Sequence, residues 1–226
     1  MNQSEMQILS LGTQSNLTEL KQKFGAAHNY LFSEDISLNQ QLKQADVVFD
    51  FFAAKHLMAN EYSNFFKPVF FNTTWITLSA MMEEAGVEQR DSFFGFCGLP
   101  TFVNRPVLEV SMRDFKNEKL LTAICAQLGT DQVCVEDRVG LVTPRVICSV
   151  INEAYCALEE GTATRSDMDL AMKLGTNYPY GPFEWATRIG IDHVVELLDA
   201  VYQEGHDERY KICALLRSEG RWIKKN

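Results

Sequence analysis

The sequence predicts a two-domain protein in which an α/β domain, residues 1–136, precedes an all-α domain, residues 137–226. In the first part, short continuous apolar runs alternate with helical stretches, which is typical of a mostly parallel sheet covered on both faces. From Pro144 onward, apolar residues recur at helical spacing instead. With 226 residues and 46% hydrophobic composition, the chain can bury a substantial core in one or two domains.

The α/β domain opens with a predicted buried strand over Met6–Gly12, where the glycine ends the apolar run. A helix is expected over Leu17–Phe24, and Gly25 closes it. Further along the chain, the apolar runs and helical stretches predict an apolar segment at Asn29–Phe32, a polar-faced helix near Leu38–Lys43, and strands at Val47–Phe52, Val69–Phe71, Phe93–Phe96 and Val107–Val110.

The all-α domain begins with a long predicted helix. Thr143 can cap it, and Pro144 fits the first helical position, where a missing N–H costs nothing. Gly161 should end it. Between these signals one broad stripe is predicted to be buried, formed by Val146, Ile147, Val150, Ile151, Ala154, Tyr155 and Leu158.

Two shorter helices are expected after the long one. Thr164–Asp167 has the form of a capping box and opens the second helix, which Gly175 should end. The Gly181-Pro182 pair starts a third helix, which carries Phe183 and Trp185. These signals alone predict a compact helical unit and no particular function.

Composition excludes several classes of protein. A formal net charge of −9 argues against nucleic-acid binding, for which a basic patch is needed. The six cysteines form no C-x-x-C pair, which favours reduced core thiols and a cytoplasmic location. The chain opens with no signal peptide and contains no apolar stretch of the roughly 18 residues that a membrane span requires. We therefore expect a soluble protein without nucleic-acid or membrane partners.

The N-terminal strand, glycine turn and helix are the parts from which a dinucleotide-binding fold is built, and they indicate a Rossmann-like domain. The G-x-G-x-x-G fingerprint is replaced by Gly12-Thr-Gln-Ser-Asn-Leu17, so Gln14 and Leu17 stand where glycines normally allow close approach to the pyrophosphate and close helix packing. Gly12 is the candidate phosphate-binding residue. Glu34 or Asp35 lies at a suitable distance to bind a ribose hydroxyl, although a solvated acid pair explains them equally well.

Several motifs in the second domain have a specific likeness. Asp137-x-x-Gly140, Arg145, then INEAYCALEEGTAT, DMDLAMKLG and YPYGPFEW occur in order. Together they resemble the C-terminal domain of the 3-hydroxyacyl-CoA dehydrogenase family over about 85 residues. The resemblance implies a helical domain that packs against a nucleotide-binding domain and pairs two subunits. It also implies an acyl-CoA substrate, NAD as cofactor and a role in fatty-acid metabolism.

The same resemblance places three catalytic positions in the first domain. Asn72-Thr73-Thr74 matches the family's turn after a strand, so Thr74 would supply the hydroxyl that helps hold the substrate. Cys97 falls on the catalytic histidine, and Glu109 falls twelve residues later on its glutamate partner. Pro100 and Pro144 replace the family's asparagines.

These substitutions set the functional alternatives. Histidine suits the role of base because its pKa lies near working pH, whereas a Cys97 thiolate beside Glu109 would be opposed by like charge. One hypothesis is an NAD-dependent 3-hydroxyacyl-CoA dehydrogenase with weak or no activity. The other is a non-catalytic protein that binds an acyl-CoA or a partner subunit. Thr74 could equally be a helix cap, Glu109 a strand residue facing a polar cleft, and Cys97 a packing residue.

Overall fold

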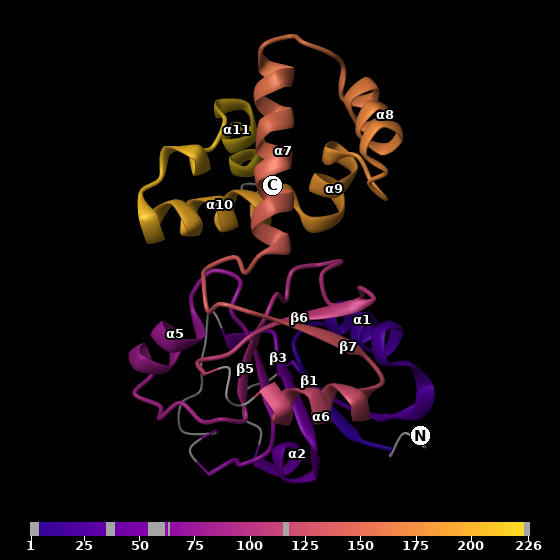
Figure 1. Ribbon diagram of the computed structural model, residues 1–226, viewed down its shortest axis with the longest axis vertical. Coiled ribbons are helices and arrows are strands. Elements are labelled where there is room, and N and C mark those ends of the chain that lie inside the picture. The colour runs from indigo at the N-terminus through magenta and orange to yellow at the C-terminus, as the bar shows by residue number, and fades with distance from the viewer. Residues whose placement is uncertain (1–4, 35–38, 54–61, 63, 115–117, 224–226) are drawn as a thin grey trace. The chain divides into compact units, whose positions relative to one another are not determined.

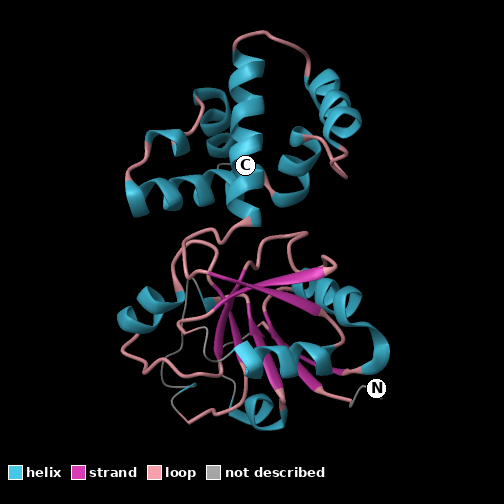
Figure 2. Cartoon of the chain, viewed as in Figure 1, coloured by secondary structure: helices cyan, strands magenta, loops and turns pink. Residues whose placement is uncertain are grey.

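The computed structural model of the protein describes residues 5–34, 39–53, 62, 64–114 and 118–223 (Figure 1). The chain forms two compact units, residues 1–141 and 142–226. Unit 1 contains a sheet with helices around it, and unit 2 contains helices and connecting loops in its described part (Figure 2). The predicted order, an α/β part followed by an all-α part, is confirmed.

The division between the units falls five residues after the predicted boundary at 136, and contacts of the intervening segment explain why. The Asp137 carboxylate accepts the N–H groups of Leu78 and Ser79 at 2.8 and 2.9 Å, at the start of a helix in unit 1. Gly140 donates its N–H to the Thr74 carbonyl at 3.0 Å. These bonds hold residues 137–140 against unit 1.

Unit 1 is built on a seven-stranded sheet in the order β2-β1-β3-β4-β5-β6-β7. All neighbouring strands are parallel except β5 and β6, which are antiparallel. The strands β1, β3, β4 and β5 are nearly continuous apolar runs because both faces of a parallel sheet are covered. The bounds are β1 Gln7–Leu11, β2 Asn29–Ser33, β3 Val47–Asp50, β4 Val69–Asn72, β5 Phe93–Phe96, β6 Val107–Ser111 and β7 Asp131–Val135.

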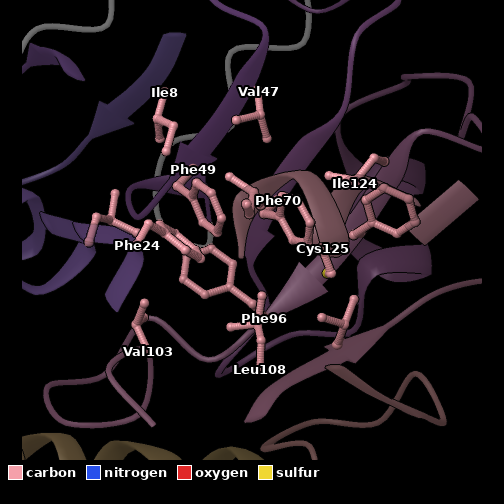
Figure 3. Packing of buried hydrophobic residues seen from close by; sticks show 14 of the residues in the cluster. Ile8, Phe24, Val47, Phe49, Phe70, Phe96, Val103, Leu108, Ile124 and Cys125 are labelled. Carbon is pink, nitrogen blue, oxygen red and sulfur yellow. The ribbon is translucent and has the colours of Figure 1, made fainter. Parts of the chain in front are cut away.

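Two hydrophobic clusters contain alternate residues of the strands. On β4, Phe70 belongs to one cluster while Val69 and Phe71 belong to the other, as the period of two along a strand requires. In the first cluster the rings of Phe49 and Phe70 stack with centroids 4.6 Å apart, and Phe96 meets Phe49 edge-on at 5.6 Å (Figure 3). This aromatic packing fixes the strand ends next to which the candidate site lies.

Four α-helices are described in unit 1, namely α1 Gln14–Phe24, α2 Asn39–Gln44, α5 Leu78–Glu84 and α6 Glu118–Leu128, together with the 3₁₀ turn η1 Gly25–Ala27. Helix α1 begins three residues before the predicted start because Thr13 caps it, and Gly25 ends it with φ of 75° as expected. Helix α6 buries Leu121, Ile124, Cys125 and Leu128 in the first cluster.

Unit 2 packs its helices around α7 Thr143–Glu159, with α9 Pro182–Ile189, α10 Ile191–Gly205 and α11 Ala214–Ile223 in contact with it. The remaining elements are α8 Arg165–Thr176 and the 3₁₀ turn η3 Glu208–Tyr210. The core of the unit includes Ile147, Ile151, Tyr155, Phe183, Trp185, Val194, Leu197 and Leu198. Gly181 caps α9 as predicted, and Thr164 caps α8 by accepting the Asp167 N–H.

Three details of unit 2 differ from the sequence-based expectation. Thr143 is the first residue of α7 and not its cap, because the helix begins one residue earlier and Val142 takes the cap position. Val146 is 50% exposed, so the stripe predicted to be buried is narrower than expected. Helix α8 continues through Gly175 and ends at Asn177, whose left-handed backbone (φ 56°) provides the stop.

Candidate active site

The carboxyl ends of the four parallel strands β1, β3, β4 and β5 meet at one edge of the sheet in unit 1. The strand β2 lies on one side of β1, and β3 lies on the other side, so the order of the strands reverses at β1. In such sheets, ligands bind beyond the carboxyl ends of the strands at the point where the order reverses. The residues that follow these strands include Gly12, Phe51, Thr74 and Cys97. Gly12, Thr74 and Cys97, three of the five predicted site residues, therefore follow these four strands on one edge, and Glu34 follows β2 at the same edge.

The turn after β1 uses its own polar groups. Gly12 donates its N–H to the Ser33 carbonyl at 3.1 Å. Asn16 Oδ1 accepts the Thr13 N–H at 2.8 Å, and Thr13 Oγ1 accepts the Asn16 N–H at 3.4 Å. Three N–H groups of the turn are thus bound within the protein, and the helix start is capped by a side chain where a dinucleotide fold presents N–H groups to phosphate.

Phe51 occupies the space beside this turn. It follows β3, is 7% exposed, and packs edge-on against Phe96 with ring centroids 5.1 Å apart. A Cβ on Gly12 would lie 3.1 Å from Phe51 Cβ and Cδ2 and 2.7 Å from Asn16 Oδ1, so the turn is closely covered. Leu17, at the third glycine position of the fingerprint, is buried in the core. The residues present do not fit a dinucleotide pyrophosphate.

The predicted ribose-binding acid lies at the same edge. Glu34 is exposed and directly follows β2, whose last residue, Ser33, accepts the Gly12 N–H. Its alternative, Asp35, lies outside the described residues. Glu34 could therefore contact a ligand at this edge, but it is also solvated as an ordinary surface acid would be.

Asn72 is the centre of the polar groups at the ends of β4 and β5. Its Oδ1 accepts the Thr74 hydroxyl at 2.6 Å, the Thr74 N–H at 3.2 Å and the Gly98 N–H at 3.0 Å, and its Nδ2 donates to the Phe51 carbonyl at 3.1 Å. Asn72 and Thr74 are almost fully buried. The hydroxyl hydrogen that would bind a substrate oxygen is engaged by Asn72, and Gly98 packs so closely that a Cβ there would lie 2.6 Å from Asn72 Cγ.

The structure brings Thr74 and Cys97 together, with Cys97 Sγ 3.6 Å from Thr74 Oγ1. Cys97 is 5% exposed. Burial raises the pKa of its thiol to about 12, against the lowering effect of Thr74, and the charges of Glu109 and Glu19 raise it further. The thiol is therefore mostly in its neutral form near pH 7.

Glu109 lies on β6, half-buried, close enough to raise the pKa of Cys97 by its charge. The same carboxylate and Cys97 favour the charged form of Arg105, although burial of the guanidinium has the larger effect and lowers its pKa. Pro100, which replaces an asparagine of the family, follows Cys97 by three residues and is half-buried.

Glu19 also lies near Cys97, and sequence reasoning did not identify it as a site residue. It projects from α1 and accepts the Asn104 N–H at 3.2 Å, and main-chain N–H groups at Thr101 and Val103 also bind it. Burial raises the pKa of Glu19 in spite of these bonds. Its position in the second turn of α1, on an otherwise polar helix face, gave no local signal, because its partners are about 85 residues away in sequence.

Asp50 is the second residue that sequence reasoning missed. It is the last residue of β3, is 4% exposed, and accepts the Tyr62 hydroxyl at 2.7 Å and the Phe52 N–H at 2.9 Å. Burial raises its pKa to about 6, against the lowering effect of these hydrogen bonds. An acidic residue that ends an apolar strand was a readable signal for a buried carboxylate at this edge.

In the part of the chain that the structure describes, no group of three or more His, Cys, Asp or Glu side chains is arranged to hold a metal ion. Within the same residues, no helix is both long and apolar enough to cross a bilayer.

Residues 140–224 match the family described as "3-hydroxyacyl-CoA dehydrogenase, C-terminal domain". The chain is 40% identical over 91 residues to 3-hydroxyadipyl-CoA dehydrogenase of Escherichia coli K12, covering 40% of this chain and 19% of that protein. It is 32% identical over 118 residues to mouse mitochondrial hydroxyacyl-coenzyme A dehydrogenase, covering 51% of this chain and 38% of that protein. The chain therefore matches well under half the length of these curated relatives.

Solved structures resemble the chain over nearly its whole length. (S)-3-hydroxybutyryl-CoA dehydrogenase of Ralstonia eutropha aligns with a TM-score of 0.71 and 21% identity, covering 95% of this chain and 93% of that one. FadB2 of M. tuberculosis aligns with a TM-score of 0.76 and 18% identity, covering 99% and 95%. At these identities the likeness concerns the fold, and it extends to the Rossmann-like sheet of unit 1.

Proposed function

Because residues 140–224 belong to the 3-hydroxyacyl-CoA dehydrogenase C-terminal domain family, we propose that this chain is a family member that binds an acyl-CoA without oxidising it. The observation that carries the proposal is the closed turn after β1. Phe51 covers Gly12, and the Thr13–Asn16 cap uses N–H groups that a pyrophosphate would require. Hydride transfer by this family depends on NAD, so a chain that does not hold NAD cannot complete the reaction.

The chemistry of the Cys97 thiol supports the same proposal. A general base typically contributes about 10²–10⁴ in rate, and a thiol with a pKa of about 12 cannot supply it near neutral pH. The Thr74 hydroxyl is already bound to Asn72, and both side chains are buried. A substrate oxygen would have to displace this bond to reach Thr74.

A second candidate function is weak NAD-dependent oxidation of 3-hydroxyacyl-CoA. One observation favours it. Thr74 and Cys97 lie in contact, and Glu109 is near enough to influence the thiol, so the three residues proposed as catalytic lie near one another. Activity would then require the carboxyl edge of the sheet to open so that Cys97 or a water molecule could act as the base.

Pairing of two copies through unit 2 is a further part of the proposal. Several large apolar side chains of the unit are exposed in the single chain, which favours their burial by a second copy; these are Val142, Val146, Leu170, Leu174, Trp222 and Ile223. Leu174, on α8, is the most exposed at 78%. A partner subunit of another sequence is the alternative occupant.

The test combines binding and turnover with acetoacetyl-CoA. Calorimetric titration should give saturable binding of acetoacetyl-CoA, while NADH consumption in its presence should stay at the background rate. Turnover near one per second, an ordinary enzyme rate, would contradict the proposal and favour the weak enzyme. Absence of acetoacetyl-CoA binding together with absence of turnover would refute the acyl-CoA part and favour a protein partner.

A further inference from the structure

A pocket of about 600 Å³ opens in unit 1, and none of the predicted catalytic and cofactor residues lines it. Its wall is formed by α1, by the segment between β5 and β6, and by the turn from α6 into β7. The volume lies within the range of roughly 300–1,000 Å³ typical of small-molecule sites. Its charged side chains are Lys23, Arg105 and Asp131.

Lys23 is held in place at the pocket wall. Its ammonium group donates to the Pro106 carbonyl at 3.1 Å and also to the Arg105 carbonyl. Burial lowers the pKa of this amine, against the smaller raising effects of Cys125 and Asp131. An ammonium has three N–H donors, and these two bonds leave one for a ligand. The conformational freedom that a surface lysine would lose on binding has already been lost here.

Arg105 is also fixed. Its Nε donates to the Thr101 carbonyl at 3.3 Å, and its guanidinium lies over the Phe102 ring, 4.5 Å from the centroid. The segment that carries it is bound to α1 by Glu19 and by the contact of Asn104 Nδ2 with Gln22 Oε1 at 3.0 Å. The two cations are therefore set by packing and hydrogen bonds before any ligand arrives.

The charges of the pocket oppose those of the whole protein. Asp131 is the one carboxylate among the lining residues, against two cations, in a chain with a net charge of −9. Partly desolvated cations of this kind favour anions, and Lys and Arg are the usual phosphate-binding side chains. We propose that this pocket binds the phosphate group of a small phosphorylated metabolite.

This proposal is independent of acyl-CoA binding at the carboxyl edge. None of the residues that line the pocket is used in the acyl-CoA proposal, so either proposal can be refuted without the other. The competing interpretation is that Lys23 serves only to hold the segment before β6 against α1. The two interpretations differ at Asp131, which is exposed and whose charge raises the pKa of Lys23. Only if the pocket binds an anion should removal of this charge change affinity.

The experiment is a calorimetric titration of the full chain at low salt with inorganic pyrophosphate and with AMP. Saturable binding is expected for at least one probe. Asp131→Asn should tighten it about three- to tenfold, and Lys23→Met should weaken it by at least as much, because a unit charge several ångströms away has an effect of this size. Lys21→Met, on the same helix outside the lining, removes the same charge and should change affinity less than twofold.

The two probes separate the sources of phosphate. Saturable binding of AMP supports a phosphorylated metabolite. Binding of pyrophosphate alone would mean that the pocket takes an inorganic ion only, and it would overturn the metabolite. The proposal is overturned if neither probe saturates, or if Lys23→Met and Lys21→Met weaken binding equally. It is also overturned if Asp131→Asn leaves affinity unchanged, and this variant remains informative even if Lys23→Met fails to fold.

Discussion

Replacement of Asp50 by asparagine should remove the part of the pH dependence of stability that this carboxyl group causes. The Asp50 carboxyl is 4% exposed, and burial raises its pKa from an ordinary 3.8 to about 6. Below pH 3.8 the folded and unfolded chains both hold the proton, so the neutral carboxyl contributes its full stability there. That contribution is lost as the pH rises through about 6. A rise of this size in the pKa corresponds to a change of about 3 kcal/mol in the free energy of unfolding between low and high pH.

The assay is urea unfolding of wild type and Asp50→Asn at a series of pH values from 4 to 7. Other carboxyl groups titrate in both proteins, so the difference between the two isolates Asp50. The free energy of unfolding of wild type, relative to the variant, should fall by about 2–3 kcal/mol over this range. Tyr62→Phe removes a hydrogen bond that lowers the pKa, and should move the fall to higher pH.

A difference between wild type and Asp50→Asn that stays constant with pH would refute the reasoning, because it would mean that Asp50 is not desolvated. A difference that grows in favour of wild type as the pH rises would reverse the assigned sign. In that case the hydrogen bonds from Tyr62 and Phe52 would outweigh burial.

Three further predictions follow from other parts of the structure. At pH 8 iodoacetamide should leave Cys97 unmodified in the folded protein, since a pKa of about 12 leaves about one thiolate in ten thousand; mass spectrometry showing modification within minutes would contradict this. Asn152→Ala should cost about 1–3 kcal/mol in urea unfolding because the buried Cys213 N–H and the Lys211 carbonyl lose their bonds to the Asn152 amide, whereas the exposed neighbour Glu153→Ala should cost under about 0.5. Sedimentation at tens of micromolar should show a dimer that Leu174→Lys weakens, and a wild-type monomer would count against pairing.

The sequence predicted those elements whose signals are local. The Gly181-Pro182 start of α9 and the Thr164 cap of α8 need only neighbouring residues, and both are confirmed. Strand β7 was missed because it lies at the edge of the sheet, where half-exposed side chains replace a continuous apolar run. Helix α6 has a readable helical period in Leu121, Ile124, Cys125 and Leu128, so it could have been predicted.

The sequence indicated that Thr74 and Cys97 lie near each other, but not the contacts that surround them. Alignment with a family placed Thr74 and Cys97 together, and the structure has them 3.6 Å apart. The role of Asn72 depends on Gly98, 26 residues later, and that of Glu19 on Asn104, 85 residues later. Such partners are set by tertiary packing, which residue spacing along one chain does not contain. The replacement of two fingerprint glycines by Gln14 and Leu17 was visible in the sequence, but Phe51 as the residue that covers Gly12 came only from the structure.

The most direct test of the central claim, that the turn after β1 does not hold a pyrophosphate, is the melting temperature of the protein with and without NAD. At about 1 mM NAD the melting temperature should change by less than about one degree, because stabilisation by a ligand scales with its concentration over its dissociation constant. If NAD bound with a dissociation constant near 10 μM, it would add about 2.7 kcal/mol and raise the melting temperature by several degrees. A rise of that size would show that the turn opens to phosphate despite Phe51 and the Thr13–Asn16 cap, and the claim would be contradicted.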